Sequence, residues 1–484
     1  MEPAVALRTS FLQHGFTMDA VLATLGGEAF AALGRGETVP SEHVLADRAD
    51  DPQTDLIRLF LLGESVPLPR ATAAMPLAEA DLLQLVARTE GDRGERVRAR
   101  LHVQPYPFGE EEGYVVSDFP ANRLAGTSAG LASEHVAGVG GASMTLATIT
   151  PRTHVATALD LGTGCGIQAL LASSHSARVV ATDRSERALR LAGLTAGLSG
   201  VSFDLRAGSL FEPVQDQVVD LLVANPPFVI SPHARFTYRE APLRADDLSR
   251  SVVTQAADRL AEGGVAVVLA NWLHLSGESW HDRLAGWAPS DCQVWAVQRE
   301  RSTPSEYVEL WLRDSAERGA PGYRNRYSEW LTYFDDLGAS GVGFGWIVVR
   351  RGGAPWFTAE DLSDAERLPS GQETLAQLDH YAALHDASAV RLLAGEPRWT
   401  PAAELHRSTR PAAPGETGLL ATGAWRPAEP VDPEVVSLLA DEGPLVERIE
   451  RRSGGTADVS DDLTASALVG IRRLIGAGLV DLGA

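Results

Sequence analysis

The stretch ATALDLGTGCGI, residues 156–167, passes from a buried-strand pattern through a glycine-rich turn into a helix. Glycines at such a turn let the backbone approach a ligand closely, where a Cβ would collide. The free N–H groups at the start of the following helix add a partial positive charge. The dinucleotide fingerprint requires G-x-G-x-x-G, and Ile167 stands where its third glycine would fall. Nicotinamide or flavin binding is therefore the weaker interpretation.

Further apolar runs of strand length follow this stretch, and helical patterns separate them. Strands that alternate with helices predict an α/β fold with a doubly wound, Rossmann-like parallel sheet. The expected strands are 156–162, 177–183, 201–208, 218–225 and 264–270, and the runs 293–298 and 345–351 are candidates to close the sheet.

The regions before and after these runs have different patterns. Helical periodicity followed by a hairpin pattern predicts an N-terminal mixed α/β, winged-helix-like domain for substrate recognition or another accessory role. A Pro- and Ala-rich stretch predicts a linker, and a small helical, winged-helix-like module follows it. The expected boundaries are 1–120, 121–352 with a helical insertion at about 300–342, 353–430 for the linker or meander, and 431–484.

Composition limits the classes of partner and compartment. The net charge of −22 disfavours broad electrostatic attachment to nucleic acid. The two cysteines, Cys165 and Cys292, exclude a disulfide framework and a cysteine zinc cluster, which fits a reducing cytoplasm. The chain has no apolar run of membrane-spanning length and its start lacks a secretory pattern, so we expect a cytoplasmic protein with no membrane partner.

A second motif lies in LLVANPPFVISP, residues 221–232, where an apolar run stops at Asn225. In a doubly wound sheet, ligands bind beyond the carboxyl ends of the strands. The Asn225 side-chain carbonyl and the Pro226 main-chain carbonyl can each accept an N–H, and Phe228 offers a stacking face. Accepting both hydrogens of a planar nitrogen would aim its lone pair at an electrophile. The alternative, a Pro-terminated strand with a buried Phe, fits poorly with an apolar run that ends in Asn.

The two motifs together resemble a known superfamily. The glycine loop after Asp160 resembles motif I of class I S-adenosylmethionine-dependent methyltransferases. With it, Asn-Pro-Pro-Phe (the NPPF motif) resembles the amino-methyltransferase group, which includes release-factor glutamine enzymes and rRNA guanine and adenine enzymes. The resemblance covers about residues 130–300. It implies S-adenosyl-L-methionine as cofactor and methyl transfer to a planar amide or amino nitrogen.

The resemblance also implies roles for individual residues. Asn225, Pro226 and Phe228 would act on the acceptor. Asp183 would accept the ribose hydroxyls of the cofactor, and its alternative role is to cap the helix that begins at 185. Ser209 stands where the family often has an acidic residue for the adenine amine. The full cofactor set is Asp160, Gly162, Thr163, Gly164, Gly166, Asp183, Ser209 and Asn225.

Several further residues near the motifs are weaker candidates. Ser143 and Thr145 are candidates to bind the cofactor carboxylate, or to cap a packed helix. Pro227, Tyr238 and Arg239 are candidates to line the acceptor pocket, and a surface loop is the alternative for the last two. His135 and His233 have no further ligands at suitable spacing, so we expect no metal site.

The leading functional hypothesis is an N-methyltransferase (EC 2.1.1), with a protein side-chain amide such as glutamine slightly favoured as acceptor. A base in rRNA, tRNA or DNA is the alternative acceptor, and a small amine-bearing molecule also remains open. A non-catalytic scaffold with a methyltransferase-like core is the hypothesis from a different class. The expected partners are a polypeptide, an RNA or a small amine, with neither metal nor membrane.

Overall fold

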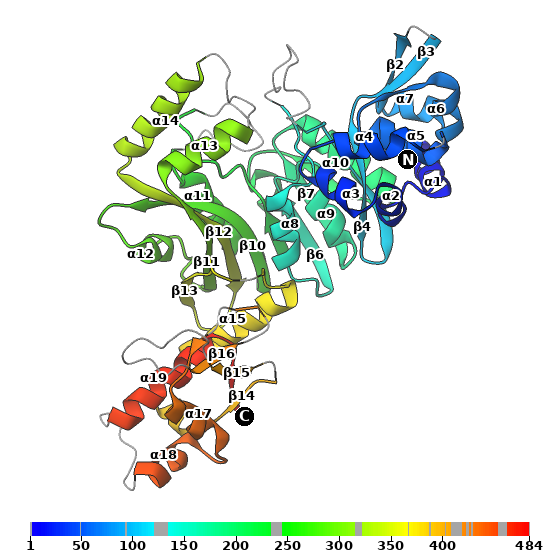
Figure 1. The fold of residues 1–484 in the computed structure, drawn as a ribbon. Helices are drawn as coiled ribbons and strands as arrows, with labels where there is room; N and C mark the ends of the chain where they lie inside the picture. The colour runs from blue at the N-terminus through cyan, green and yellow to red at the C-terminus, as the bar shows by residue number, and fades with distance from the viewer. Residues whose placement is uncertain are drawn as a thin grey trace.

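The computed structural model describes residues 2–483 except 49, 92–93, 121–133, 234–243, 315–321, 366, 387–388, 402, 408–418, 423–424, 427–428 and 454–461. In this part of the chain an eight-stranded sheet forms the centre of the molecule (Figure 1). An N-terminal domain adjoins it on one side, and a C-terminal module lies at its far end in the same view.

The strand order in the sheet is β13-β11-β12-β10-β9-β6-β7-β8. Neighbours from β8 to β10 run parallel, and β12 runs antiparallel to both β10 and β11. The predicted doubly wound sheet is confirmed, but it is not parallel throughout. The strand β12 starts at the end of the sheet where β11 finishes and runs back between β11 and β10. The strands are β6 (Val155–Leu161), β7 (Ser176–Asp183), β8 (Asp204–Ala207), β9 (Val219–Ala224), β10 (Leu260–Leu275), β11 (Cys292–Ser302), β12 (Ala339–Arg351) and β13 (Trp356–Asp361).

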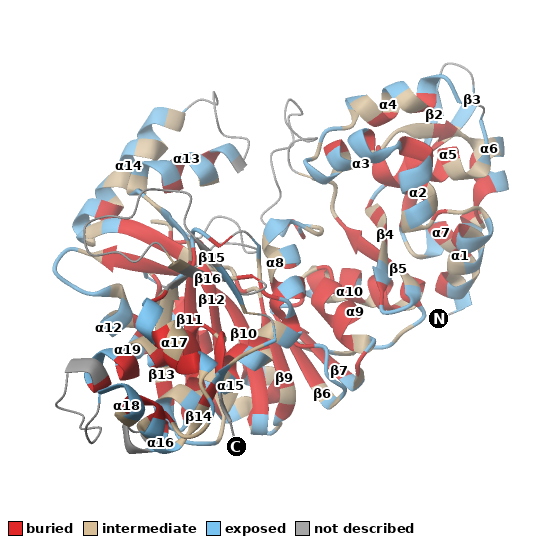
Figure 2. Ribbon diagram, turned by 60° about the horizontal axis from the view of Figure 1, so that its bottom comes forward, coloured by how far each residue is buried: buried red, intermediate tan, exposed pale blue. Residues whose placement is uncertain are grey.

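Helices cover both faces of the sheet, and strand side chains alternate between the two cores. Leu159 and Leu161 join the core beneath α11 and α12, whereas Ala158 joins the core beneath α8, α9 and α15. Covered on both faces, the strands β9 to β12 are apolar along most of their length and appear largely buried in Figure 2. The edge strands β8 and β13 are more exposed. The helices are α8 (Gly141–Ile149), α9 (Ile167–Ser173), α10 (Glu186–Ser199), α11 (Asp247–Ala256), α12 (Trp280–Ala285) and α15 (Gly371–Asp386).

The N-terminal domain has the expected mixed α/β character. After four helices, a helix–strand–helix–helix–hairpin sequence forms a small sheet of order β1-β3-β2, which is a winged-helix-like arrangement. Its elements are α1 (Glu2–Gln13), α2 (Met18–Leu25), α3 (Gly27–Gly34), α4 (Val39–Ala46), α5 (Pro52–Leu56) with a π-helical turn (Ile57–Leu61), β1 (Ser65–Pro67), α6 (Leu68–Ala74), α7 (Leu77–Leu82), β2 (Val86–Gly91) and β3 (Gly94–Ala99).

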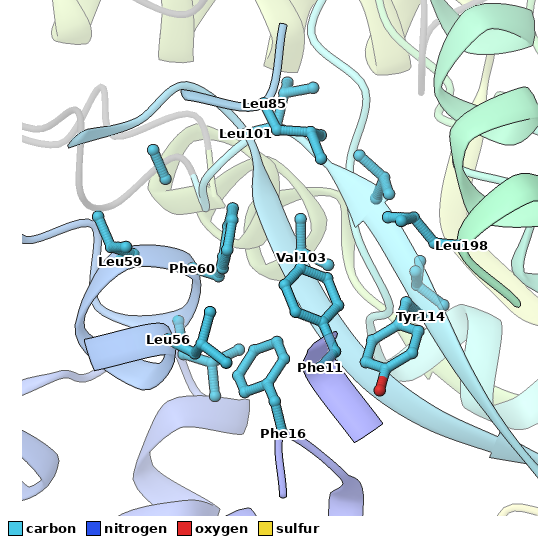
Figure 3. Packing of buried hydrophobic residues seen from close by; sticks show 14 of the residues in the cluster. Phe11, Phe16, Leu56, Leu59, Phe60, Leu85, Leu101, Val103, Tyr114 and Leu198 are labelled. Carbon is cyan, nitrogen blue, oxygen red and sulfur yellow. The ribbon is translucent and has the colours of Figure 1, made fainter. Parts of the chain in front are cut away.

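A second hairpin joins this domain to the sheet domain. It consists of β4 (His102–Phe108) and β5 (Glu111–Ser117). Two side chains of α10 accept hydrogen bonds from β5: Ser199 Oγ from Tyr114 N at 2.9 Å and Thr195 Oγ1 from Val116 N at 3.0 Å. Leu198 of α10 belongs to the same buried cluster as Phe11 (Figure 3), so the two domains share one core.

A helical insertion connects β11 to β12. It consists of α13 (Pro304–Asp314) and α14 (Tyr323–Asp336). Tyr307, Val308 and Phe334 of these helices pack in one cluster with Val229 and Ile230. The insertion therefore covers the segment that follows β9.

The C-terminal module contains four described helices, a strand pair and a small three-stranded sheet. Its described elements are α16 (Ala389–Ala394), β14 (Glu396–Trp399), β15 (Glu404–Arg407), β16 (Leu419–Thr422), β17 (Glu429–Pro430), α17 (Pro433–Ala440), α18 (Leu445–Ser453), α19 (Asp462–Gly476) and β18 (Val480–Gly483), and β14 pairs with β18. None of the helices in the described ranges is both long and apolar enough to cross a membrane.

Candidate active site

The glycine-rich turn between β6 and α9 depends on backbone conformations that favour glycine. The φ angles of Gly162, Gly164 and Gly166 are +75°, +54° and +82°. At Gly166 a Cβ would lie 3.1 Å from Ala192 Cα, so this glycine also lets the turn approach α10. At Gly162 and Gly164 a Cβ would meet no atom within 4 Å. The open space beside these two glycines is where a ligand can approach the backbone.

Asp160 organises the turn from the end of β6. Its carboxylate Oδ2 accepts hydrogen bonds from Thr163 Oγ1 at 2.6 Å and from Ala169 N at 3.0 Å. The residue is 2% exposed, and burial raises its pKa to about 7. Asp160 therefore fixes the loop and the first turn of α9 from within, and it also lines the cavity described below.

Asp183 ends β7 directly beside the glycine turn. Its two carboxylate oxygens accept hydrogen bonds from Gly164 N at 3.0 Å and from Ser185 N at 2.8 Å. Burial raises the pKa of this carboxyl group as well. The alternative role as a helix cap is wrong, because Ser185 is the N-cap of α10 and its side chain accepts from Ala188 N.

The turn after β8, residues 208–210, lies at the same end of the sheet as the glycine turn and lines the cavity described below. Gly208 has a φ of +157°, and a side chain there would collide with Pro213. Leu210, which is not a glycine, has a φ of +49°. A non-glycine residue in this region of conformational space is held there by its surroundings and is often found at functional sites. Ser209 lies between them, and its N–H donates to Glu212 Oε2 at 3.1 Å.

The Asn-Pro-Pro-Phe tip continues from β9, whose last residue Ala224 pairs with β6 and β10. Asn225 is half-buried, and no described residue makes a hydrogen bond with its side chain. The Pro226 carbonyl accepts the N–H of Phe228 at 2.7 Å, so the tip closes as a tight turn. A carbonyl oxygen has two lone pairs, and one remains for an acceptor N–H. The Phe228 ring lies 5.5 Å from the Phe344 ring of β12.

These turns surround one cavity of about 400 Å³. It lies beyond the carboxyl ends of β6 to β9, where the strand order reverses between β6 and β9, which is the usual ligand position in such sheets. The predicted residues that line it are Asp160, Gly162, Thr163, Gly164, Asp183, Ser209, Asn225, Pro226, Pro227, Ser143 and His135.

Other predicted residues lie elsewhere. Gly166 and Phe228 are adjacent to the cavity but do not line it, and neither does Thr145. His233 is exposed, and its Nε2 lies 2.7 Å from Oε1 of Glu329, a residue of α14 in the insertion. Tyr238 and Arg239 fall outside the described residues. In the described ranges, no group of three or more His, Cys, Asp or Glu side chains is arranged to hold a metal ion.

Several residues that line the cavity were not among the predicted ones. Gln168, in the first turn of α9, donates through Nε2 to the Ser143 carbonyl at 2.8 Å and so joins α8 to the glycine turn. Its position two residues after Gly166 was the available signal. Glu134 and Arg184 also line the cavity. Arg184 directly follows Asp183, whereas no local pattern marks Glu134.

Comparisons with known proteins agree with this geometry. Residues 133–279 match the methyltransferase small domain family, and residues 13–100 match a domain of unknown function. The release factor glutamine methyltransferase of Geobacter sulfurreducens is 34% identical over 128 residues, which is 24% of this chain and 45% of the relative. The ribosomal protein uL3 glutamine methyltransferase of Bradyrhizobium diazoefficiens is 32% identical over 164 residues, which is 33% of this chain and 48% of the relative. The predicted resemblance to this methyltransferase group is confirmed for the sheet domain.

These likenesses have limited extent. The chain spans about half the length of the curated relatives it matches. A solved 16S rRNA N2 methyltransferase of T. thermophilus, in complex with AdoMet and guanosine, aligns over 48% of this chain and 60% of its own, with 16% identity and a TM-score of 0.28.

Proposed function

We propose that this protein is an S-adenosylmethionine-dependent N-methyltransferase whose acceptor is the side-chain amide of a glutamine in a polypeptide. One observation carries the proposal: the glycine turn, Asp183 and the Asn225–Pro226 tip line the same cavity. A cofactor loop and an acceptor-holding tip at one cavity are what group transfer to a planar nitrogen requires.

The cavity suits the cofactor in size and in chemistry. Its volume of about 400 Å³ lies in the range of small-molecule sites. Each Asp183 oxygen accepts one hydrogen bond, and a carboxylate has about four lone-pair sites, which leaves capacity for two ribose hydroxyls. When bound, S-adenosylmethionine supplies a methyl group activated by a positively charged sulfonium, and the carboxylates of Asp160 and Asp183 favour positive charge in the cavity.

The tip suits a planar amide. An amide nitrogen is a poor nucleophile because its lone pair is delocalised. Asn225 and Pro226 both line the cavity, and in this proposal the Asn225 side-chain oxygen and the remaining lone pair of the Pro226 carbonyl accept the two N–H groups of the amide. Holding both hydrogens orients the nitrogen and favours the localised lone pair. No general base is required before transfer, because the proton is lost to water once the nitrogen carries the methyl group.

The acceptor class rests on three observations. The relatives matched over the sheet domain are named for glutamine in a release factor or in ribosomal protein uL3. The net charge of −22 opposes attachment to RNA. A groove of about 650 Å³ adjoins the cavity at His135, Ala137 and Gly138, and α2, α3 and β4 of the N-terminal domain line its far side. A groove of this size beside the cavity provides room for a polypeptide chain.

The test is methyl transfer to an extract from a strain that lacks this protein. The purified protein and S-adenosylmethionine with a labelled methyl group are added, and protein, RNA and small-molecule fractions are separated. We expect label in the protein fraction, on glutamine in the digested peptides. Label in RNA would replace the acceptor assignment. If the protein neither binds S-adenosylmethionine in calorimetry nor labels any fraction, the non-catalytic scaffold is correct instead.

A further inference from the structure

Tyr307, on helix α13 of the insertion, holds the backbone that follows the Asn-Pro-Pro-Phe tip. Its hydroxyl oxygen accepts hydrogen bonds from Ile230 N at 3.0 Å and from Asn271 Nδ2 of β10 at 2.7 Å. Ile230 and Asn271 are each 1% exposed. A buried N–H without a partner is costly, so this hydroxyl fixes where the chain runs after the tip.

Tyr333, on helix α14, makes the equivalent contact at the start of α11. Its hydroxyl accepts the N–H of Ala245 at 2.9 Å. Ala245 has a φ of +53°, which is unfavourable for any residue with a Cβ. The next residue, Asp246, is 3% exposed and accepts two hydrogen bonds from Arg283, at 2.7 and 2.9 Å. The strained position is therefore held by contacts on both sides.

The tip itself has little freedom between its fixed points. Ala224 is held in the sheet by β6 and β10. Two prolines follow Asn225, and the Phe228 N–H closes onto the Pro226 carbonyl. With φ fixed at both prolines, the direction of the tip depends on where its far end, Ile230, is fastened. The Tyr307 hydroxyl provides that fastening point.

The geometry points to Tyr307 and Tyr333 as positioning residues for methyl transfer, through which the α13–α14 insertion sets the placement of Asn225 and Pro226. The inference rests on the proposed function for its catalytic part. Packing alone does not require the two hydroxyls, because a phenylalanine ring would fill the same space. They act by accepting the N–H groups of Ile230, after the tip, and of Ala245, before α11, and both of these residues belong to or pack against the cluster that includes Val229.

The matched variants are Tyr307→Phe and Tyr333→Phe, with Tyr327→Phe as control. The Tyr327 hydroxyl donates to Glu309 Oε1 at 2.9 Å, within the insertion and on its exposed side. All three changes remove one hydroxyl from the same two helices, and only the first two release backbone near the site. The full-length protein is used throughout.

Two measurements are made on each variant. The first is the rate of label transfer to the protein fraction of the deletion-strain extract, as S-adenosylmethionine is varied. For Tyr307→Phe and Tyr333→Phe we expect the maximal rate to fall roughly 10- to 100-fold, with KM for S-adenosylmethionine unchanged, because a displaced tip misorients the acceptor and not the cofactor. The second is hydrogen exchange, which should accelerate at Ile230 in Tyr307→Phe and at Ala245 in Tyr333→Phe. Tyr327→Phe should match the wild type in both.

The outcomes separate this inference from the proposed function. If the wild type transfers no methyl group, the proposed function fails, and the exchange data still test whether the two hydroxyls hold the backbone. If the wild type is active and both variants transfer at its rate, the inference is overturned. A fall in rate accompanied by an equal rise in KM, or an equal loss in Tyr327→Phe, would overturn it as well, because either result indicates general loosening of the fold.

Discussion

At the residue scale, burial of the Asp160 carboxyl group changes its pKa and so makes stability and cofactor binding depend on pH. Its hydrogen bonds come from Thr163 and Ala169, and no described cation pairs with it. Burial therefore raises its pKa to about 7. A raised pKa means that the folded protein binds a proton more tightly than the unfolded chain does. In the cofactor-free protein, the contribution of Asp160 to the free energy of unfolding, measured as the difference between the wild type and Asp160→Asn, should fall as pH rises from about 4 to about 7.

The raised pKa of Asp160 also leads us to expect that the affinity for the cofactor depends on pH. A cationic sulfonium in the cavity favours the charged carboxylate, so binding below pH 7 expels a proton. The affinity for S-adenosylmethionine should rise by up to about tenfold per pH unit between pH 5.5 and about 7 and then level off. S-adenosylhomocysteine, a neutral thioether, should show a smaller rise, and calorimetry with both ligands measures the ratio. An unchanged ratio from pH 5.5 to 7.5 would contradict the prediction, and Asp160→Asn, the control, should remove the effect.

At the scale of elements, the β6–α9 turn separates glycines needed for the fold from glycines needed for the ligand. Gly166→Ala adds a Cβ 3.1 Å from Ala192 at a φ of +82°, so it should lower the free energy of unfolding by about 2–3 kcal/mol. Gly162→Ala meets no atom, so it should cost only the strain of its φ, about 1–2 kcal/mol.

We expect the two substitutions to affect the affinity for the cofactor in the opposite order. Gly162→Ala should weaken S-adenosylmethionine binding by roughly tenfold or more, because its Cβ would lie in the space beside the turn. Gly166→Ala should weaken binding less, since Gly166 does not line the cavity. Denaturant unfolding and calorimetry on the two variants check both orders. A larger affinity loss in Gly166→Ala would contradict the separation.

The local patterns predicted these elements well. The expected strand at 177–183 is β7 (Ser176–Asp183), and the expected end of β9 at Asn225 is correct to within one residue. Continuous apolar runs sufficed to locate the strands, because both faces of the sheet are covered. The run at 345–351 was expected as a strand and lies in β12, but its antiparallel direction was not predicted, since an apolar run carries no information on direction. The strand β13 was not predicted. The Tyr307–Ile230 contact joins residues 77 apart, and no local pattern could indicate it.

Some residues of the candidate site could be predicted from a local sequence pattern, and others could not. Asp160 and Asp183 were predicted because each lies at or next to the end of a strand beside the glycine turn, and both line the cavity. Their different hydrogen bonds, inside the turn for Asp160 and across it for Asp183, appear only in the folded chain. Leu210 carries a φ of +49° without the glycine that would have marked it.

At the scale of the whole molecule, a buried ionic cluster anchors the C-terminal region to the edge of the sheet. Arg426 pairs with Glu360 of β13, and their side chains are 7% and 17% exposed. Glu360 also accepts the Trp295 Nε1–H of β11 at 2.9 Å, and the Trp425 ring lies 6.1 Å from the Trp295 ring. None of these residues lines the cavity.

Removal of the cation should therefore affect stability and leave cofactor binding intact. Arg426→Ala leaves the Glu360 carboxylate buried without its partner, which should cost about 3–5 kcal/mol. The control is Arg398→Ala, in the exposed pair with Glu396, which should change stability by less than about 1 kcal/mol. Denaturant unfolding gives both values, and the Kd for S-adenosylmethionine should stay within about twofold in each. Equal losses of stability in the two variants would contradict the prediction that the buried Arg426–Glu360 pair contributes more to stability than the exposed Arg398–Glu396 pair.

The most direct test of the central claim, that Asn225 holds the acceptor nitrogen beside the cofactor cavity, is a paired measurement on Asn225→Ala. Its Kd for S-adenosylmethionine and its rate of label transfer to the protein fraction are compared with those of the wild type. We predict a Kd within about twofold and a transfer rate lower by roughly 100- to 1,000-fold, as for loss of a group that acts on the reacting centre. Transfer at the wild-type rate, or a Kd weakened as much as the rate, would contradict the claim.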